Sequence, residues 1–202
     1  MKYQILIPGG ELEKAVLAFL NKVGFNVTFT PRCYKAGSPL SPYEFVIVRA
    51  ASIPEIISNP LFPTVLGGIT GSDILWENGW NRKTTPLPIS SPSRLFVGAA
   101  KCIKSLTDLR NTTLATKYPN IAKDFFRQNN VPVNIFPIPG KDEALPYLSD
   151  QVKAIVGIRS TGKTLKANNL KVLREISPCT VNWIARPGNF NALKLFKQKL
   201  GV

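Results

Sequence analysis

The strongest constraint on the fold of this chain is an alternation of short apolar runs with segments that carry apolar residues at helical spacing. Residues 3–7 form a β-type run that ends at Pro8-Gly9-Gly10, and residues 12–23 then follow a helical pattern. Residues 45–48 and 65–69 are further buried-strand runs. Strands that alternate with helices predict an α/β protein with largely parallel sheets. In such sheets ligands bind at the carboxyl ends of the strands.

The same patterns predict the remaining elements. We expect strands at residues 27–29, 94–100, 114–116, 134–138, 152–156, 171–176 and 181–185. We expect helices at residues 53–57, from residue 74, at 120–129 and at 141–148, where Pro146 interrupts the last. A C-terminal helix would carry Phe190, Leu193, Phe196 and Leu200 on one face. Residues 31–42 are expected to be a surface loop, and the Pro- and Ser-rich residues 84–92 are the best boundary between lobes.

Composition excludes several classes of protein. The chain has 202 residues and 44% apolar content, enough for one large domain or two small lobes. Its apolar runs are too short for a membrane span, and no signal peptide is visible, so we expect a cytoplasmic protein. Three widely spaced cysteines argue against a disulfide framework or a zinc site. The absence of histidine excludes Ser-His, Cys-His and His-metal chemistry.

The chain is strongly basic. Its formal net charge is +14, which favours anionic partners such as polyphosphates, nucleic acid or an acidic subunit. The basic residues are spread along the chain, with only local doublets and no arginine-rich tract. Nucleic-acid binding is therefore not expected as the main function.

Residues 157–164, Gly-Ile-Arg-Ser-Thr-Gly-Lys-Thr, follow an apolar run and satisfy the P-loop pattern G-x-x-x-x-G-K-[ST]. In that pattern loop amides and a lysine hold phosphates. A P-loop NTPase also needs a full helix after the turn and a downstream Asp for its metal ion, and no Asp follows Thr164. The segment therefore predicts a phosphate-binding turn in a protein that is not a P-loop NTPase.

Three other segments can bind anions, and each has a structural alternative. Residues 68–73 (Gly-Ile-Thr-Gly-Ser-Asp) can offer amides, hydroxyls and a carboxylate to a ligand, or simply cap a helix. Arg49, at a strand end, can clamp a phosphate or form a surface salt bridge. Residues 116–119 (Thr-Lys-Tyr-Pro) place a cation beside an aromatic ring, which suits a nucleobase or phosphate, or pack against their own lobe.

In this order the segments resemble the short form of ATP phosphoribosyltransferase, the first enzyme of histidine biosynthesis. The matching segments are residues 5–12, 48–50 with Ile53-Pro54, 68–73, 115–120 (Ala-Thr-Lys-Tyr-Pro-Asn), and 161–165 (Thr-Gly-Lys-Thr-Leu) with Asn168. The resemblance implies a two-lobed fold like the type II periplasmic binding proteins, with the ligand cleft between the lobes. Lobe I would comprise residues 1–92 with 178–202, and lobe II residues 93–177.

The resemblance also implies a reaction and its ligands. The enzyme would join N1 of ATP to C1 of the ribose of phosphoribosyl pyrophosphate (PRPP) and release pyrophosphate, with Mg²⁺ escorting the phosphates. Ser160, Thr161, Gly162, Lys163 and Thr164 would hold the 5-phosphate of PRPP, and Glu143 would face its ribose hydroxyls. The residues implied for ATP are Arg49, Thr70, Gly71, Asp73, Lys117 and Tyr118. No catalytic residue and no protein metal ligand is assigned.

The resemblance further implies a partner, a regulatory subunit that resembles histidyl-tRNA synthetase, and a homo- or hetero-oligomer. The chain departs from the family pattern at Gly9 and Glu11, where cations are usual, and at Lys153 and Gly157, where acidic residues are usual. These departures leave two alternatives open. One is a phosphate-ligand-binding homologue without turnover that acts as a sensor or subunit, and the other is a phosphoribosyltransferase with a different acceptor.

Overall fold

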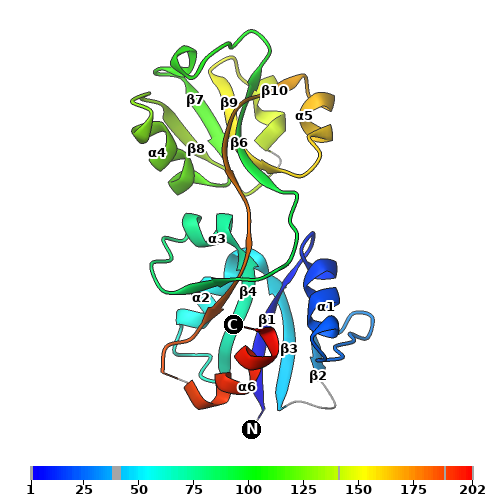
Figure 1. Cartoon of the computed structure of the whole chain (residues 1–202). Coiled ribbons are helices and arrows are strands. Elements are labelled where there is room, and N and C mark those ends of the chain that lie inside the picture. Colours follow the sequence, from blue (N-terminus) through cyan, green and yellow to red (C-terminus); the bar gives the residue numbers. More distant parts are fainter. Residues whose placement is uncertain (1, 38–41, 141, 189, 202) are drawn as a thin grey trace. The chain divides into compact units, whose positions relative to one another are not determined.

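The structure, a computed structural model, describes residues 2–37, 42–140, 142–188 and 190–201. The chain divides into two compact units, which Figure 1 shows in blue to green with red, and in green to orange. Unit 1 comprises Met1–Ser91 and Thr180–Val202, and unit 2 comprises Pro92–Cys179. The boundaries expected from the sequence lie one or two residues from these.

Unit 1 is built on a six-stranded sheet in the order β2-β3-β1-β4-β11-β5. Its strands are β1 (Tyr3–Gly9), β2 (Lys35–Gly37), β3 (Tyr43–Arg49), β4 (Val65–Gly71), β5 (Thr84–Pro86) and β11 (Val181–Ala185). Strand β1 runs parallel to both β3 and β4, while β2, β11 and β5 pair in antiparallel fashion. The carboxyl ends of β1, β3 and β4 therefore meet at one edge of the sheet.

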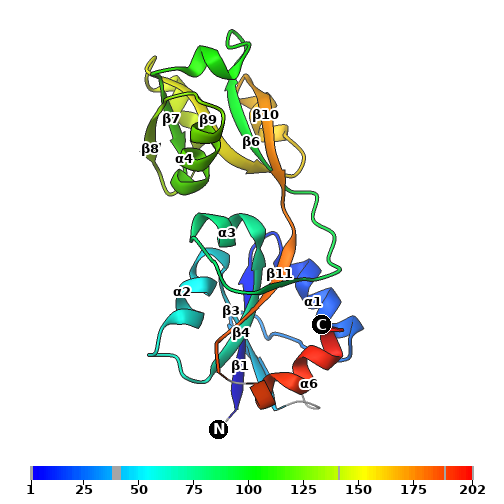
Figure 2. The same cartoon turned by 60° about the vertical axis from the view of Figure 1, so that its left-hand side comes forward.

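Helices cover both faces of this sheet (Figure 2). They are α1 (Glu13–Lys22), α2 (Ile53–Ser58), α3 (Ser72–Glu77) and α6 (Phe190–Leu200), and a 3₁₀ turn spans Ala50–Ser52. Because side chains alternate along a strand, Ile5 and Ile7 of β1 pack in the same core as buried residues of α1 and α6. Leu6 points to the opposite face and joins Ile53 and Ile57 of α2.

Aromatic rings form the centre of the larger core of unit 1. The ring centroids of Trp183 and Phe196 lie 4.7 Å apart, and those of Phe25 and Phe196 lie 4.9 Å apart. Phe196 and Leu200 of α6 are buried, as the helical pattern predicts. The side chains of residues 190–193, which include the expected Phe190 and Leu193, lie outside the described part.

Unit 2 is built on a five-stranded sheet in the order β10-β6-β9-β7-β8. Its strands are β6 (Arg94–Ala100), β7 (Thr113–Thr116), β8 (Asn134–Pro137), β9 (Val152–Arg159) and β10 (Leu170–Pro178). Its helices are α4 (Pro119–Gln128), α5 (Lys163–Ala167) and the 3₁₀ segments η2 (Leu106–Leu109) and η3 (Asp142–Tyr147). Strand β7 is parallel to β8 and β9, so these three strands end at a common edge (Figure 1).

The expected α/β class is confirmed, but several local expectations are wrong. Both sheets are mixed rather than largely parallel. No strand forms at residues 27–29. The side-chain amide of Asn21 donates to the carbonyl of Val27 and accepts from its N–H, so these backbone groups are not available to a neighbouring strand. Strands β2 and β5 lie in stretches expected to be irregular, and the segment around Pro146 is a 3₁₀ helix.

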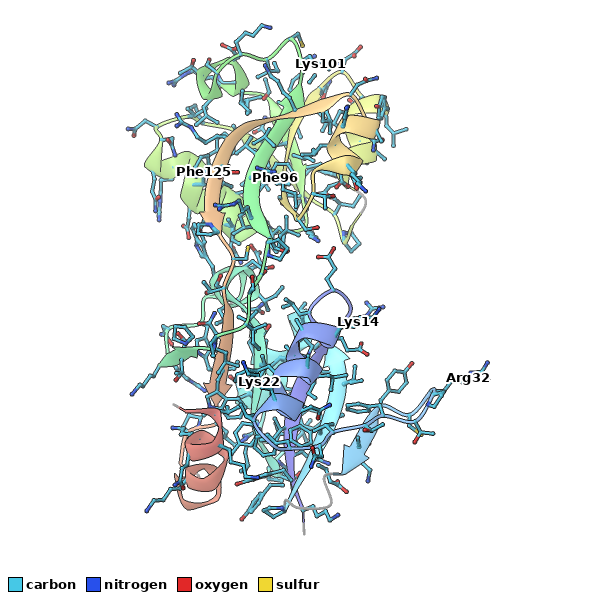
Figure 3. The ribbon with its side chains drawn as sticks, turned by 45° about the vertical axis from the view of Figure 1, so that its right-hand side comes forward. Lys14, Lys22, Arg32, Phe96, Lys101 and Phe125 are labelled. Atoms are coloured by element: carbon cyan, nitrogen blue, oxygen red, sulfur yellow. The ribbon has the colours of Figure 1, made fainter. Side chains whose placement is uncertain are left out.

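Basic side chains are dispersed over the surface of the described chain. Lys14 and Lys22 on α1, Arg32 before β2 and Lys101 after β6 are all exposed, and Arg32 projects away from its sheet (Figure 3). This distribution agrees with the scattered charge of the sequence. Among the described helices, none combines the length and apolar character that a membrane span requires.

Candidate functional site

The expected phosphate loop connects β9 to α5 in unit 2. Strand β9 ends at Arg159, and Ser160, Thr161 and Gly162 lead into α5. Gly162 has φ +73°, a left-handed conformation that glycine adopts without a Cβ penalty. Thr161, Lys163 and Thr164 are exposed, while buried Leu165 anchors the short helix to the core. The loop thus presents two hydroxyls and an ammonium group on the surface of unit 2.

The arginine that precedes this loop is already paired. The guanidinium of Arg159 donates to a carboxylate oxygen of Glu175, and Nη1 of Arg94 lies 3.6 Å from the other oxygen. Two arginines therefore share one carboxylate beside the loop. Helix α5 has only five residues, which is shorter than the full helix of a P-loop NTPase.

Strand β7 ends in a turn that Thr116 holds in place. The buried Thr116 hydroxyl donates to the carbonyl of Val156 at 2.6 Å and accepts from the amide of Tyr118 at 2.8 Å. Lys117 is exposed, and its Nζ lies 5.2 Å from the ring centroid of Tyr118, which is buried. Thr116 was not assigned a role from the sequence. A threonine directly after a buried apolar pair was the signal that could have identified it.

The η3 segment brings two carboxyl groups to the same region of unit 2. Glu143, the residue implied for the ribose hydroxyls, is half-buried. Its neighbour Asp142 is only 4% exposed, and the Oδ2 atom of Asp142 has no hydrogen-bond partner among the described residues. Burial, and then the charge of Glu143, raise the pKa of Asp142 to about 6, while the charge of Lys117 opposes the shift. No pattern in the sequence marks Asp142 as a site residue.

The raised pKa of Asp142 predicts a pH-dependent stability. Between about pH 4 and pH 6 the folded protein holds a proton that the unfolded chain releases, so the free energy of unfolding falls as the pH rises. Asp142→Asn cannot ionise, and at pH 8 it should be more stable than the parent protein by about 1–2 kcal/mol. At pH 4 this advantage should vanish. Urea denaturation at both pH values measures the difference, and a gain that does not change with pH contradicts the prediction.

The residues implied for ATP in unit 1 lie where β3 and β4 end. Arg49 is exposed at the end of β3, in register with Gly9 of β1. The Thr70 hydroxyl is buried and donates to the carbonyl of Ala50 at 3.3 Å, which ties the end of β4 to the turn after Arg49. The Thr70 hydroxyl therefore stabilises the turn after β3, and Thr70 also lies at the edge of the sheet where β3 and β4 end.

Gly71 and Asp73 are closely fitted at the start of α3. Asp73 is buried in the first turn of the helix. A Cβ atom on Gly71 would collide with Oδ1 of Asp73, so a larger residue at position 71 would force this carboxylate to move. The neighbouring turn at the end of β1 is held by the Gly10 amide, which donates to Glu13 at 3.4 Å, and leaves Glu11 exposed.

The structure thus groups the expected residues into two sets, one in each unit. Unit 1 brings together Arg49, Thr70, Gly71 and Asp73 at one edge of its sheet. At one edge of its own sheet, unit 2 brings together Lys117, Tyr118, Glu143 and the loop of residues 160–164. The combination of two α/β units with mixed sheets and polar strand ends defines the class of two-lobed, type II periplasmic-binding-protein-like folds.

Solved structures support this class. The HisG:HisZ complex of ATP phosphoribosyl transferase from Thermotoga maritima matches with a TM-score of 0.80 and 24% identity, covering 98% of this chain and 96% of that one. Tv2483 bound to L-arginine matches with a TM-score of 0.62 and 14% identity over 99% of this chain and 84% of that one. The aliphatic sulphonate binding protein SsuA from Escherichia coli has a TM-score of 0.57 and 12% identity over 98% and 63%. These likenesses establish the fold.

Sequence comparison establishes the family. The family model of ATP phosphoribosyltransferase matches residues 49–200. The ATP phosphoribosyltransferase of Lacticaseibacillus casei is 31% identical over 91% of this chain and 86% of its own length. That of Methanopyrus kandleri is 33% identical over 88% of this chain, which spans 62% of that relative. The chain belongs to the ATP phosphoribosyltransferase family, which confirms the resemblance found in the sequence.

Proposed function

We propose that this protein transfers the 5-phosphoribosyl group of PRPP to N1 of ATP and releases pyrophosphate, the first step of histidine biosynthesis. The observation that supports this most is the hydroxyl-rich loop between β9 and α5, in a chain of the ATP phosphoribosyltransferase family. Phosphate recognition by hydroxyls, loop amides and a lysine is the chemistry that such a loop offers.

We assign PRPP to unit 2. Ser160, Thr161, Gly162, Lys163 and Thr164 are proposed to bind its 5-phosphate. The half-buried Glu143 is proposed to accept hydrogen bonds from the ribose hydroxyls.

We assign the adenine nucleotide to the other residues implied by the family. In unit 1 these are Arg49, Thr70, Gly71 and Asp73; Arg49 is exposed to bind phosphate, and the carboxylate of Asp73 can accept a hydrogen bond from an amino or hydroxyl group. In unit 2 they are Lys117 and Tyr118. Since the Tyr118 ring is buried, Lys117 is the group of this pair that is placed to contact the ligand.

The proposed reaction needs no histidine. The lone pair of adenine N1 forms the bond to ribose C1, while the C1–oxygen bond breaks and pyrophosphate leaves with its electron pair. Positioning of the two substrates and stabilisation of the leaving group supply most of the rate acceleration. The protein residues would hold the phosphate and the ribose while these bonds change.

We propose that Mg²⁺ binds to the phosphates of the substrates. Mg²⁺ is commonly held by substrate phosphates and one or two carboxylates, with several waters retained. The loop fits this arrangement, because its hydroxyls and Lys163 can bind the 5-phosphate and leave the pyrophosphate oxygens to the ion. When bound, the ion would neutralise charge on the leaving pyrophosphate. Among the described residues no three potential metal ligands cluster.

We also propose a regulatory partner. The Thermotoga maritima structure is of a HisG:HisZ complex, and the match to it covers 98% of this chain. A subunit related to histidyl-tRNA synthetase is the partner that we propose, in a hetero-oligomer with this chain. Size-exclusion chromatography with multi-angle light scattering, with and without a purified candidate subunit, tests both points.

The loop assignment predicts the effect of removing its hydroxyls. Thr161→Val with Thr164→Val keeps the shape of both side chains but removes two hydrogen bonds to phosphate, so PRPP affinity should fall by about a hundredfold. Calorimetric titration with PRPP and Mg²⁺ measures this change. Thr112→Val in the same unit, outside the loop, is the matched control and should leave the affinity unchanged. An unaltered PRPP affinity in the double variant rejects the loop as the phosphate site.

Incubation with ATP, PRPP and Mg²⁺ tests the proposed function directly, with and without a candidate regulatory subunit. Formation of phosphoribosyl-ATP and pyrophosphate supports it. Binding of PRPP without product in either mixture supports the binding homologue left open by Gly9, Glu11 and Gly157. Turnover only with another base supports a changed acceptor.

A further inference from the structure

Asp142 and Gly157 face one another in unit 2. A Cβ atom on Gly157 would lie 3.6 Å from Oδ2 of Asp142 and 3.4 Å from two ring atoms of Phe96. Phe96 lies on β6 (Figure 3). Its partner in the register of the adjacent strand β9 is Gly157. Because residue 157 is glycine, the space before it is bounded by an aromatic ring and by a carboxylate oxygen. The oxygen is the polar wall of this space.

This oxygen lacks a partner that a folded protein normally provides. Asp142 is 4% exposed, so water has little access to its side chain, and no described residue donates a hydrogen bond to Oδ2. Buried polar atoms are almost always hydrogen-bonded, and an orphaned carboxylate oxygen is unfavourable. Glu143 beside it is another acceptor and adds to the unfavourable charge. A donor from a bound molecule would satisfy the atom.

The position of Asp142 limits what that molecule can be. Gly157 lies on β9, three residues before Ser160, which is about 10 Å along a strand. One small molecule with a phosphate in the loop can therefore reach this space with its other end. The end that reaches Oδ2 must carry a donor, and the hydroxyls of a sugar phosphate are such donors.

We infer that Asp142 is a further ligand-binding residue of unit 2, whose Oδ2 accepts a hydrogen bond from a hydroxyl of the sugar phosphate held by the loop of residues 160–164. This inference rests on the proposed function and adds a second carboxylate to Glu143. Asp142 then discriminates between ligands: a sugar phosphate contacts both the loop and Asp142, whereas inorganic phosphate contacts the loop alone.

Calorimetry with two probes, ribose 5-phosphate and inorganic phosphate, tests this inference. Asp142→Asn should weaken ribose 5-phosphate binding by about tenfold, because a charged acceptor is replaced by a neutral amide, whose hydrogen bond to a hydroxyl is weaker. Its affinity for inorganic phosphate should stay within about twofold of the parent protein on the same argument. Asp150→Asn is the matched control: Asp150 is exposed in the same connection to β9, and its replacement should change neither affinity. Circular dichroism checks the fold, and Asp142→Ser serves if the Asn variant does not fold.

The outcomes separate the inference from the proposed function. Equal binding of ribose 5-phosphate by the parent protein and Asp142→Asn overturns the inference, and so does a loss of both ligands together, which indicates a structural role. Failure of the parent protein to bind ribose 5-phosphate also overturns it. Selective loss of ribose 5-phosphate in a protein that forms no phosphoribosyl-ATP supports the inference and rejects the proposed function. Normal formation of phosphoribosyl-ATP, together with unchanged ribose 5-phosphate binding in Asp142→Asn, supports the proposed function and rejects the inference.

Discussion

Gly67→Ala should lower the free energy of unfolding by at least about 3 kcal/mol, because the new methyl group has no space. Gly67 lies in the middle of unit 1, on β4, paired with Ala185 of β11. Its Cβ would lie 2.5 Å from two ring atoms of Trp183 and in direct collision with the carbonyl oxygen of Ile184. Neither group can move easily, since the Trp183 ring is buried against Phe196 and the carbonyl is part of the adjacent strand.

Urea denaturation followed by tryptophan fluorescence measures this loss. Gly37→Ala is the matched control, because Gly37 also lies in a strand of the same sheet and nothing lies within 4 Å of its added Cβ. The control should change the free energy of unfolding by less than about 1 kcal/mol. If both variants unfold at the same urea concentration, the close packing of β4 against Trp183 is not what restricts residue 67 to glycine.

Arg186→Met should lower the free energy of unfolding by about 3 kcal/mol, because one side chain binds four backbone carbonyls. Nε of Arg186 donates to the carbonyl of Val65 at 2.8 Å. Nη2 donates to the carbonyls of Ile56, Asn59 and Phe62 at 2.9–3.1 Å. These carbonyls lie in the last turn of α2, in the loop after it and at the first residue of β4, so methionine would leave this connection without its polar support. A cation at a helix C-terminus is also favourable to the helix dipole.

The same denaturation experiment distinguishes the hydrogen bonds of Arg186 from a general effect of its charge. Arg127→Met removes an exposed arginine that pairs with Asp124 at 3.1 Å on the same helix, and it should change stability by about 0.5 kcal/mol or less. Arg186→Lys should recover only a small part of the loss, because an ammonium group cannot reproduce the planar fork. Full stability of the lysine variant would mean that the positive charge alone supports the loop.

Much of the fold follows from local patterns in the sequence, but strand pairing does not. The run at Tyr3–Gly9 and the helix after it form as the hydrophobic periodicity predicts. Strand β5 was missed because Thr84–Pro86 has no apolar pattern and forms only against β11, almost a hundred residues later in the chain. The absence of a strand at residues 27–29 depends on the side chain of Asn21, a contact that no periodicity encodes.

The candidate site was predictable where residues are contiguous and not where they come from separate segments. The loop of residues 160–164 is one short motif, so its residue types identify it directly. Asp142 was missed because its importance depends on burial and on the missing side chain of Gly157, which lies in another element. Similarly, the sequence marks Thr116 only as a threonine that follows a buried apolar pair, and its hydrogen bonds to Val156 and Tyr118 are needed to show its positioning role.

The discontinuity of unit 1 has a consequence for the order of events during protein synthesis. Residues 92–179 leave the ribosome before β11 and α6, so unit 2 can fold while unit 1 still lacks a strand and a helix. During that interval the edge of β4 that later pairs with β11 is unpaired, and the aromatic core of unit 1 lacks Trp183 and Phe196. At translation rates of about 5–20 residues per second this interval lasts several seconds, during which the nascent chain is most exposed to aggregation and to chaperones.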